Sequence, residues 1–268
     1  MKKLALVISL IQPLLVVSQF YSGSVMTEER APAPYVNIGV PNNNVGTVSD
    51  INGKFTIYLT NQKNSDSLVF SSIGFFSFSI SIADFKAREK KIITLERKSY
   101  PLKEAIIKSA KPTLKRKGVT TDSELIIGKL VDSLGYELGV KIRNNKHSRL
   151  KNLYVNIGRS DYDSLFFRVN IYNVEHDRRF KNILTEPLYL TASKKETDTT
   201  IIFDLYPFEI WVKSDFLVTL EYVKNLGQGG LFYCAAAGKS CYFRTTSQGD
   251  WKKVPFAPSI SVDMLFYD

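Results

Sequence analysis

The stretch Val45-Gly46-Thr47-Val48-Ser49-Asp50-Ile51-Asn52-Gly53-Lys54-Phe55-Thr56-Ile57 decides the fold, because it predicts a strand, a tight turn and a returning strand. β-forming residues alternate on both sides of the turn, as expected for two half-buried strands. Within the turn, Asp50 and Asn52 can bond their own backbone, and Gly53 can adopt a positive φ. An EF-hand calcium loop needs Glu at its twelfth position, which is Asn61 here. We therefore interpret the stretch as a hairpin whose turn is capped by its own side chains.

The first residues predict an export signal. Lys2 and Lys3 precede an apolar run from Leu4 to Val17, and cleavage after Ser18 fits the small residues there. The run is shorter than the ~20 residues that a membrane span needs, so we expect no transmembrane segment after cleavage. No cysteine follows the run to carry a lipid anchor. Residues 1–18 are therefore predicted to be a signal peptide, and the mature protein to be exported: periplasmic, at the cell surface or secreted.

Residues 19–109 contain short β-patterned segments and no long helical period, which predicts a small antiparallel β-sandwich. In the last part of this region, apolar residues alternate with serines between Phe76 and Ile82, as in a strand with one apolar face. The expected strands are 20–25, 35–38, 45–48, 55–59, 67–75, 76–82, 91–95 and 102–107.

Several of these segments carry a family resemblance. The segments are Gly23-Ser24-Val25, Val36-Asn37-Ile38, Gly46-Thr47-x-Ser49-Asp50-x-Asn52-Gly53-x-Phe55, Leu68-x-Phe70-Ser71-x-Ile73-Gly74-Phe75, Ile93-x-Leu95 and Leu102-x-Glu104-Ala105. In this order, they resemble the carboxypeptidase regulatory-like domain, a transthyretin-like β-sandwich common in exported Bacteroidetes proteins. The resemblance implies a fold and no peptidase activity, since the family takes its name from a non-catalytic accessory domain.

Two segments join this region to the rest of the chain. Residues 110–122 are basic and contain Pro112 and Gly118, which predicts a solvated linker. Export and the lack of interleaved aromatic residues argue against a nucleic-acid site, and we expect no nucleic-acid partner. Apolar residues between Asp122 and Gly135 fit either a capped helix or a strand at Leu125–Ile127 followed by a loop. The surrounding β pattern favours the strand.

Residues 123–268 return to alternating apolar and polar residues, in about eight or nine segments. This pattern predicts a second, jelly-roll-like β-sandwich, so the chain is all-β. The segments Gly135–Gly139, Tyr162–Tyr172 and Tyr242–Trp251 resemble the C-terminal region of exported Bacteroidetes proteins that carry the same N-terminal domain. This second resemblance implies no activity.

The sequence lacks the familiar catalytic and cofactor motifs. His147 and His176 both lie in charged loop segments, and no zinc-binding spacing of His or Cys is present. Asp161 and Asp163 fit a hairpin loop better than a surface Ca²⁺ site. There is no Gly-x-Ser-x-Gly and no phosphate-binding glycine loop before a helix. We predict no catalytic residue, no metal and no cofactor.

The two cysteines, Cys234 and Cys241, flank a predicted hairpin formed by residues 231–237 and 240–246. If Ala237-Gly238 is the turn, the cysteines lie opposite each other, and an oxidising compartment favours a disulfide. If the turn is Gly238-Lys239, the cysteines are staggered and no bond is expected.

Aromatic side chains on the outward faces of strands are the last candidate site. Trp211, Tyr242 and Trp251 are the predicted ligand-stacking residues, since sugar-binding sandwiches stack ligands on such rings. The alternative is that loops or the first domain cover these rings. We therefore predict a non-enzymatic, exported binding or cell-envelope structural module, whose partner is an envelope protein or a glycan. The alternatives are a carbohydrate-binding accessory protein and a hydrolase with an unrecognised site.

Overall fold

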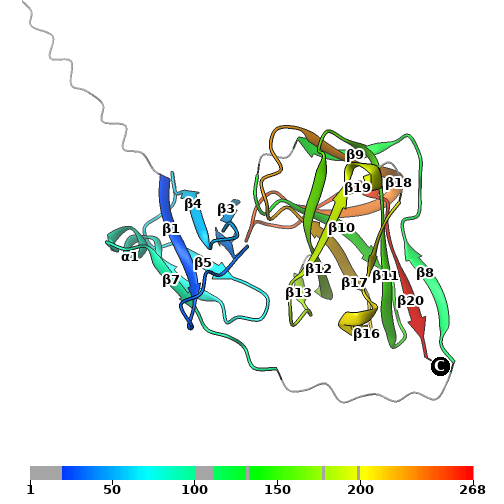
Figure 1. The fold of residues 1–268 in the computed structure, drawn as a ribbon, viewed down its shortest axis with the longest axis horizontal. Coiled ribbons are helices and arrows are strands. Elements are labelled where there is room, and N and C mark those ends of the chain that lie inside the picture. The colour runs from blue at the N-terminus through cyan, green and yellow to red at the C-terminus, as the bar shows by residue number, and fades with distance from the viewer. Residues whose placement is uncertain (1–19, 101–110, 131–132, 177–178, 198–199, 268) are drawn as a thin grey trace, which may run out of the picture.

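The computed structural model describes residues 20–100, 111–130, 133–176, 179–197 and 200–267. The predicted signal peptide and the strand expected at 102–107 lie outside the described residues. Figure 1 shows a small N-terminal unit beside a larger C-terminal unit, both built of strands. The prediction of an all-β chain, with a small two-sheet N-terminal unit followed by a larger β unit, is confirmed. No helix among the described residues is long and apolar enough to cross a membrane.

The N-terminal unit consists of two sheets around one core. The first sheet has the order β4-β1-β7, and the second has the order β3-β2-β5-β6. Their bounds are β1 Phe20–Thr27, β2 Asn37–Val40, β3 Val45–Val48, β4 Lys54–Tyr58, β5 Ser67–Ser71, β6 Phe78–Ser81 and β7 Ile92–Leu95. Strand β4 alternates between exposed and buried residues, and its apolar face packs into the core between the sheets.

The hairpin at Val45–Ile57 is formed as predicted, and its two strands belong to different sheets. One carboxylate oxygen of Asp50 accepts the backbone N–H groups of Asn52 and Lys54, both at 2.8 Å. Gly53 has a φ of +72°, and a side chain there would collide with the carbonyl oxygen of Val25. Only glycine suits this position, because it tolerates both the positive φ and the close backbone contact.

The alternating segment Phe76–Ile82 is strand only over β6, and a short helix, α1 (Ile82–Ala87), follows it. The Ser81 side chain caps this helix by accepting the N–H of Asp84 at 3.0 Å. Ile82 and Phe85 point into the core from one helix face. The alternation predicted a strand through Ile82, but the cap at Ser81 ends it one residue earlier.

The C-terminal unit is one continuous, folded sheet around a single large core. Its strands are β8 Thr113–Gly118, β9 Ile126–Leu130, β10 Glu137–Ile142, β11 Ser148–Ser160, β12 Ser164–His176, β13 Arg179–Asn182, β14 Leu188–Ser193, β15 Thr200–Asp204, β16 Trp211–Val212, β17 Phe216–Glu221, β18 Gly230–Arg244, β19 Lys252–Pro258 and β20 Ile260–Phe266. Two short helices, α2 (Lys194–Thr197) and η1 (Tyr206–Phe208), lie between strands. The long strands β11 and β18 each pair with neighbours in both halves of the sheet, which folds it around the core.

The basic segment expected to be a linker is partly a strand. β8 pairs with β20 over six residue pairs, from Thr113–Phe266 to Gly118–Ser261. The guanidinium of Arg116 bonds the carboxylate of Asp263 at 2.8 Å and lies over the ring of Tyr154. These contacts attach the segment to the C-terminal unit. The charges of the segment alone did not predict this attachment. In the ambiguous segment after it, β9 confirms the strand rather than the helix, although Leu125 and Ile126 are exposed rather than buried.

The predicted hairpin around Gly238-Lys239 is wrong. Residues 230–244 form the single strand β18, with a register shift between Ala237 and Cys241 and a positive φ at Gly238. Cys234 lies opposite Ile126 of β9, whereas Cys241 lies opposite Val140 of β10. Both thiols are buried and free, so the expected disulfide is absent. Because the chain bends at Gly238 without reversing, the two cysteines are not brought face to face.

Candidate binding site

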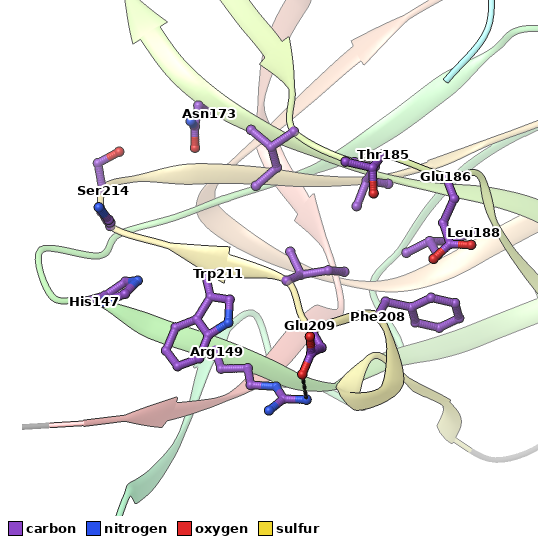
Figure 2. A pocket seen from close by; sticks show the side chains of 14 residues that line it. His147, Arg149, Asn173, Thr185, Glu186, Leu188, Phe208, Glu209, Trp211 and Ser214 are labelled. Carbon is purple, nitrogen blue, oxygen red and sulfur yellow. Dashed lines mark ion pairs between the residues drawn. The ribbon is translucent and has the colours of Figure 1, made fainter. Parts of the chain in front are cut away.

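Trp211 lies at the rim of a pocket at one end of the C-terminal unit. Strand β16 pairs with the start of β11, which places Trp211 opposite Arg149. The preceding turn is η1, with Pro207 in its first turn, followed by Glu209 in the left-handed conformation (φ 49°). A non-glycine residue at positive φ is uncommon and often marks a functional site. Phe208 and Trp211, which lie on either side of Glu209 in Figure 2, both line the pocket.

The pocket, which we call the Trp211 pocket, has a volume of about 680 Å³. Its floor is aliphatic, and two aromatic rings stand at its sides (Figure 2). The apolar residues that line it are Ile183, Leu184, Leu188, Phe208, Ile210 and Trp211. A pocket of this size, with apolar side chains and a few polar groups in its lining, is within the range of small-ligand sites.

Polar side chains of both charges surround this apolar floor. Asn173 and Ser214 lie on one side of the pocket, and Thr185 and Glu186 lie on another (Figure 2). Lys213 contributes a cation. These groups come from three different parts of the fold, namely β12, the segment after β13 and the segment around β16. They offer both donors and acceptors to a ligand on the apolar floor.

The position of Arg149 is fixed by three contacts. Its guanidinium stacks 3.8 Å from the ring centroid of Tyr206, donates to the Tyr206 carbonyl at 2.8 Å and pairs with Glu209 at 3.5 Å. Its Nε–H is buried and has no hydrogen-bond partner among the described residues. The Trp211 ring also contacts two tilted rings, with centroid distances of 4.7 Å to His147 and 5.3 Å to Tyr267. The wall of the pocket is therefore preorganised.

The structure separates the three predicted stacking residues. Tyr242 is only 5% exposed and packs at 5.4 Å from Phe180 of β13. Trp251 packs edge-on against the same Phe180 at 5.1 Å, with the guanidinium of Arg244 over its ring. These two rings belong to an aromatic cluster that shares no residue with the lining of the Trp211 pocket. Of the three predicted residues, Trp211 alone lines this pocket.

A buried ionic network of Glu137, Arg168, Glu221 and Arg244 is the main polar feature that the sequence did not predict. Arg168 donates to Glu221 through Nε at 3.0 Å and Nη2 at 2.8 Å. Arg244 donates to Glu137 at 2.8 Å and lies 3.7 Å from Glu221. Further donors to the two carboxylates are Asn170, Tyr172 and Thr219. All four charged groups therefore have partners, as buried charges require.

This network also joins the two units. Arg168 donates to the backbone carbonyl of Tyr35 at 2.7 Å and to the side chain of Asn37, both in the N-terminal unit. Ser247 donates to the same Asn37 oxygen at 3.2 Å. Beside these bonds, Tyr35 packs against Phe166 at 5.3 Å. The interface between the units thus combines buried polar bonds with a buried apolar cluster that contains Tyr35, Val48 and Val223.

The network is expected to make stability depend on acidity. Burial alone would raise the pKa of Glu221, but Arg168 and Arg244 outweigh it and hold this pKa below its usual 4.5. The folded carboxylate then stays ionised at pH values where the unfolded one takes up a proton. The free energy of unfolding should therefore fall as the pH drops below about 4.5, by up to ~1.4 kcal/mol per pH unit for this group.

Urea denaturation between pH 3 and 7 measures this dependence. Glu221→Gln cannot titrate, so its stability should change less steeply with pH below 4.5 than that of the unmodified protein. Glu196 makes a suitable comparison, since its pKa is also lowered but it is exposed on α2, where Ser193 donates to it. A Glu196→Gln variant that flattened the pH dependence as much as Glu221→Gln would contradict the role of the network.

Asp161, Asp163 and His147 are not brought together, and the side chain of His176 lies outside the described part of the chain. Asp161 pairs with Arg159 and accepts the N–H of Gly230, which makes it part of a loop. Asp163 extends toward Lys194 at 3.8 Å. Among the described residues, no three His, Cys, Asp or Glu side chains are grouped so that they could hold a metal ion. His147 lies beside Trp211 rather than near either aspartate.

Comparison with known proteins supports the assignment of the N-terminal unit. Residues 21–107 match the model of the CarboxypepD_reg-like domain, which confirms the resemblance over this part of the chain. No curated protein matches the chain. Two solved structures similar to it are the infectious bursal disease virus Gt strain (9% identity, TM-score 0.26) and the VP2 subviral particle of infectious bursal disease virus (13% identity, TM-score 0.19).

These matches cover 92% and 93% of this chain, which spans 62% and 64% of the length of the viral chains. Likeness at such TM-scores carries no argument about fold or function.

Proposed function

We propose that the protein is an exported, non-catalytic binding module whose C-terminal unit holds a carbohydrate in the Trp211 pocket. The observation that carries this proposal is the pocket itself, with an aromatic wall, an aliphatic floor and a polar rim of both charges. A sugar ring has an apolar face that can lie on Trp211 and hydroxyl groups that can reach Asn173, Thr185 or Ser214. The CarboxypepD_reg-like domain, typically a non-catalytic sandwich, fits the role of an attached module.

The contact between the two units supports a module that acts as one body. Buried hydrogen bonds from Arg168 to Tyr35 and Asn37 connect them, so a ligand held at the Trp211 pocket is also held relative to the N-terminal unit. The same observation favours the alternative, a structural component of the cell envelope that uses the two units as a rigid spacer. Export itself rests on the predicted signal peptide at residues 1–18.

Binding to an array of plant, host and bacterial glycans tests the proposal. Trp211→Ala should weaken binding at least tenfold, because the stacking surface is lost. Trp251→Phe is the matched control, since Trp251 packs in the other aromatic cluster, and it should bind like the unmodified protein. A blank array would refute a carbohydrate ligand and leave the structural alternative. Binding that survives Trp211→Ala would place the ligand elsewhere.

Tryptophan fluorescence gives an independent readout, because the chain has only two tryptophans. In Trp251→Phe, all tryptophan emission comes from Trp211, and the glycan found on the array should change its intensity or wavelength. In Trp211→Phe, the emission comes from Trp251 and should not respond. A response from both variants would indicate a general conformational change instead of contact at the pocket.

A further inference from the structure

A second hollow lies between the two units, away from the Trp211 pocket. Its larger part has a volume of about 950 Å³ and is lined by strands β1 and β4 on one side and by Val223–Asn225 on the other. A smaller part, about 520 Å³, continues it along β3 and β4. The two parts share the lining residues Thr47, Thr56, Leu134, Lys224 and Asn225. We call this continuous hollow the interunit groove.

Exposed apolar side chains line both parts of the interunit groove. Ile51 is 65% exposed and Ile92 is 43% exposed in the larger part. Phe20 is 62% exposed and Tyr58 is 50% exposed in the smaller part, where their ring centroids lie 4.9 Å apart with the rings tilted. An exposed apolar surface bordered by polar groups commonly marks an interaction site. These four side chains remain exposed to water unless a binding partner covers them.

The rim of the groove is positively charged. Lys54, Lys90, Lys91 and Lys224 line it. The one acidic side chain in the lining is Asp50, whose carboxylate is engaged by two backbone amides of its own turn. Within the described residues, the ammonium groups of Lys54 and Lys90 make no ion pair. The groove therefore presents free cations beside its apolar walls, which is complementary to a ligand with both carboxylates and apolar groups.

Both strands that run along the groove are sheet edges. Among the residues that the structure describes, β4 pairs with β1 alone and β3 pairs with β2 alone. An edge strand leaves backbone N–H and C=O groups unpaired on its outer side. An extended peptide can bond such groups while its alternate side chains enter the adjacent hollow. The unpaired N–H and C=O groups of the edge strands can thus form a ladder of hydrogen bonds with a peptide backbone, which a non-peptide ligand lacks.

Other occupants fit the interunit groove less well. A lipid bilayer is flat, whereas the groove is walled on its far side by Leu134 and Val223–Asn225. A second copy of this chain carries the same formal charge of +10 and would repel it. An anionic polysaccharide would satisfy the lysines but not the aliphatic side chains Ile51 and Ile92. A single extended polypeptide satisfies the shape, the charge and the apolar walls together.

We propose that the interunit groove binds an extended, acidic segment of a partner protein that carries apolar side chains between its carboxylates. This site is separate from the Trp211 pocket and goes beyond the proposed carbohydrate binding. The lysines attract and orient the segment, the exposed apolar side chains bury its alternate residues, and the edge of β4 or β3 bonds its backbone.

The test uses an array of ten-residue peptides that alternate Glu or Asp with Val, Ile, Phe or Tyr. The best binder is labelled with fluorescein and measured by anisotropy with the full chain. Lys54→Glu/Lys90→Glu should weaken binding at least tenfold, since both rim cations become anions. Lys239→Glu/Lys252→Glu is the matched control, because it makes the same charge change at exposed residues outside the groove, and it should bind within twofold of the unmodified protein.

A second pair of variants tests the apolar walls. Ile51→Ser/Ile92→Ser removes exposed apolar groups without touching a core, so the fold should remain and peptide binding should fall several-fold. Trp211→Ala should leave peptide binding unchanged, which keeps this test independent of the carbohydrate proposal.

Three outcomes would overturn the proposal. These are an array without any binder, equal loss in both double-lysine variants, and groove-dependent binding of phosphatidylglycerol vesicles or dextran sulfate in place of peptide.

Discussion

Replacing Arg168 by methionine is expected to lower the free energy of unfolding by about 3–5 kcal/mol. Methionine occupies a similar volume but cannot donate, so the buried carboxylate of Glu221 loses both bonds from Arg168. Its remaining cation, Arg244, lies 3.7 Å away and is already engaged by Glu137. The large effect comes from leaving a buried charge without its partner rather than from the strength of one ion pair.

Urea denaturation followed by far-UV circular dichroism and tryptophan fluorescence measures this loss. Arg159→Met is the matched control, because Arg159 forms an exposed pair with Asp161 at 3.0 Å, and such pairs contribute less than ~1 kcal/mol. In Arg168→Met/Glu221→Leu, no unpaired carboxylate remains at Glu221, so part of the stability should return. If Arg168→Met and Arg159→Met differed by less than 1 kcal/mol, the network would not support the fold.

The buried ionic network could not be predicted from the sequence, because its partners come from distant parts of the chain. Arg168 alternates with apolar neighbours in β12, and this pattern correctly places it on the face opposite the main core. In an isolated sandwich that face would meet water. Here the N-terminal unit covers it, and Glu221, 53 residues later, supplies the countercharge. The sequence pattern of a single strand does not indicate that another unit of the chain will cover its polar face.

Elements that depend on interactions between residues close in sequence, by contrast, were predicted correctly. The turn at Asp50–Gly53 formed because its bonds connect residues two to four positions apart. Strand alternation correctly identified most of the sheet. It failed at β18, where a strand can bend at Gly238 and continue, because glycine signals a change of direction without specifying a reversal. The disulfide prediction depended on that reversal and failed with it.

Aromatic residue type predicted the candidate site only in part. Trp211, Tyr242 and Trp251 were equivalent as sequence positions, and the structure distinguishes them through a fourth residue, Phe180. β13 brings Phe180 over the other two rings, whereas Trp211 sits on the short strand β16 at a pocket. The polar rim around that pocket comes from segments far apart in sequence, so its convergence could not be read from spacing.

Replacing Gly46 by alanine is expected to weaken the contact between the two units. Gly46 lies in β3, within the hairpin that organises the N-terminal unit, and an added Cβ would collide with the backbone carbonyl of Ser247 in the C-terminal unit. Gly39 on the paired strand faces the same carbonyl. Because that oxygen is backbone, it can yield only if the segment around Ser247 shifts. Overpacking of this kind costs about 1–3 kcal/mol.

Amide hydrogen exchange shows which segments of the chain are destabilised by the substitution. Gly46→Ala should speed the exchange of amides in 247–250 and 44–48 together, by about 5- to 150-fold, since the interface opens more often. Gly23→Ala is the control, because its Cβ would meet Phe55 and Lys91 inside the N-terminal unit. It should loosen β1 and β7 and leave 247–250 protected. The same pattern of exchange in both variants would mean that Gly46 serves the N-terminal core alone. A difference confined to Gly46→Ala would show that the hairpin is also the docking surface for the C-terminal unit.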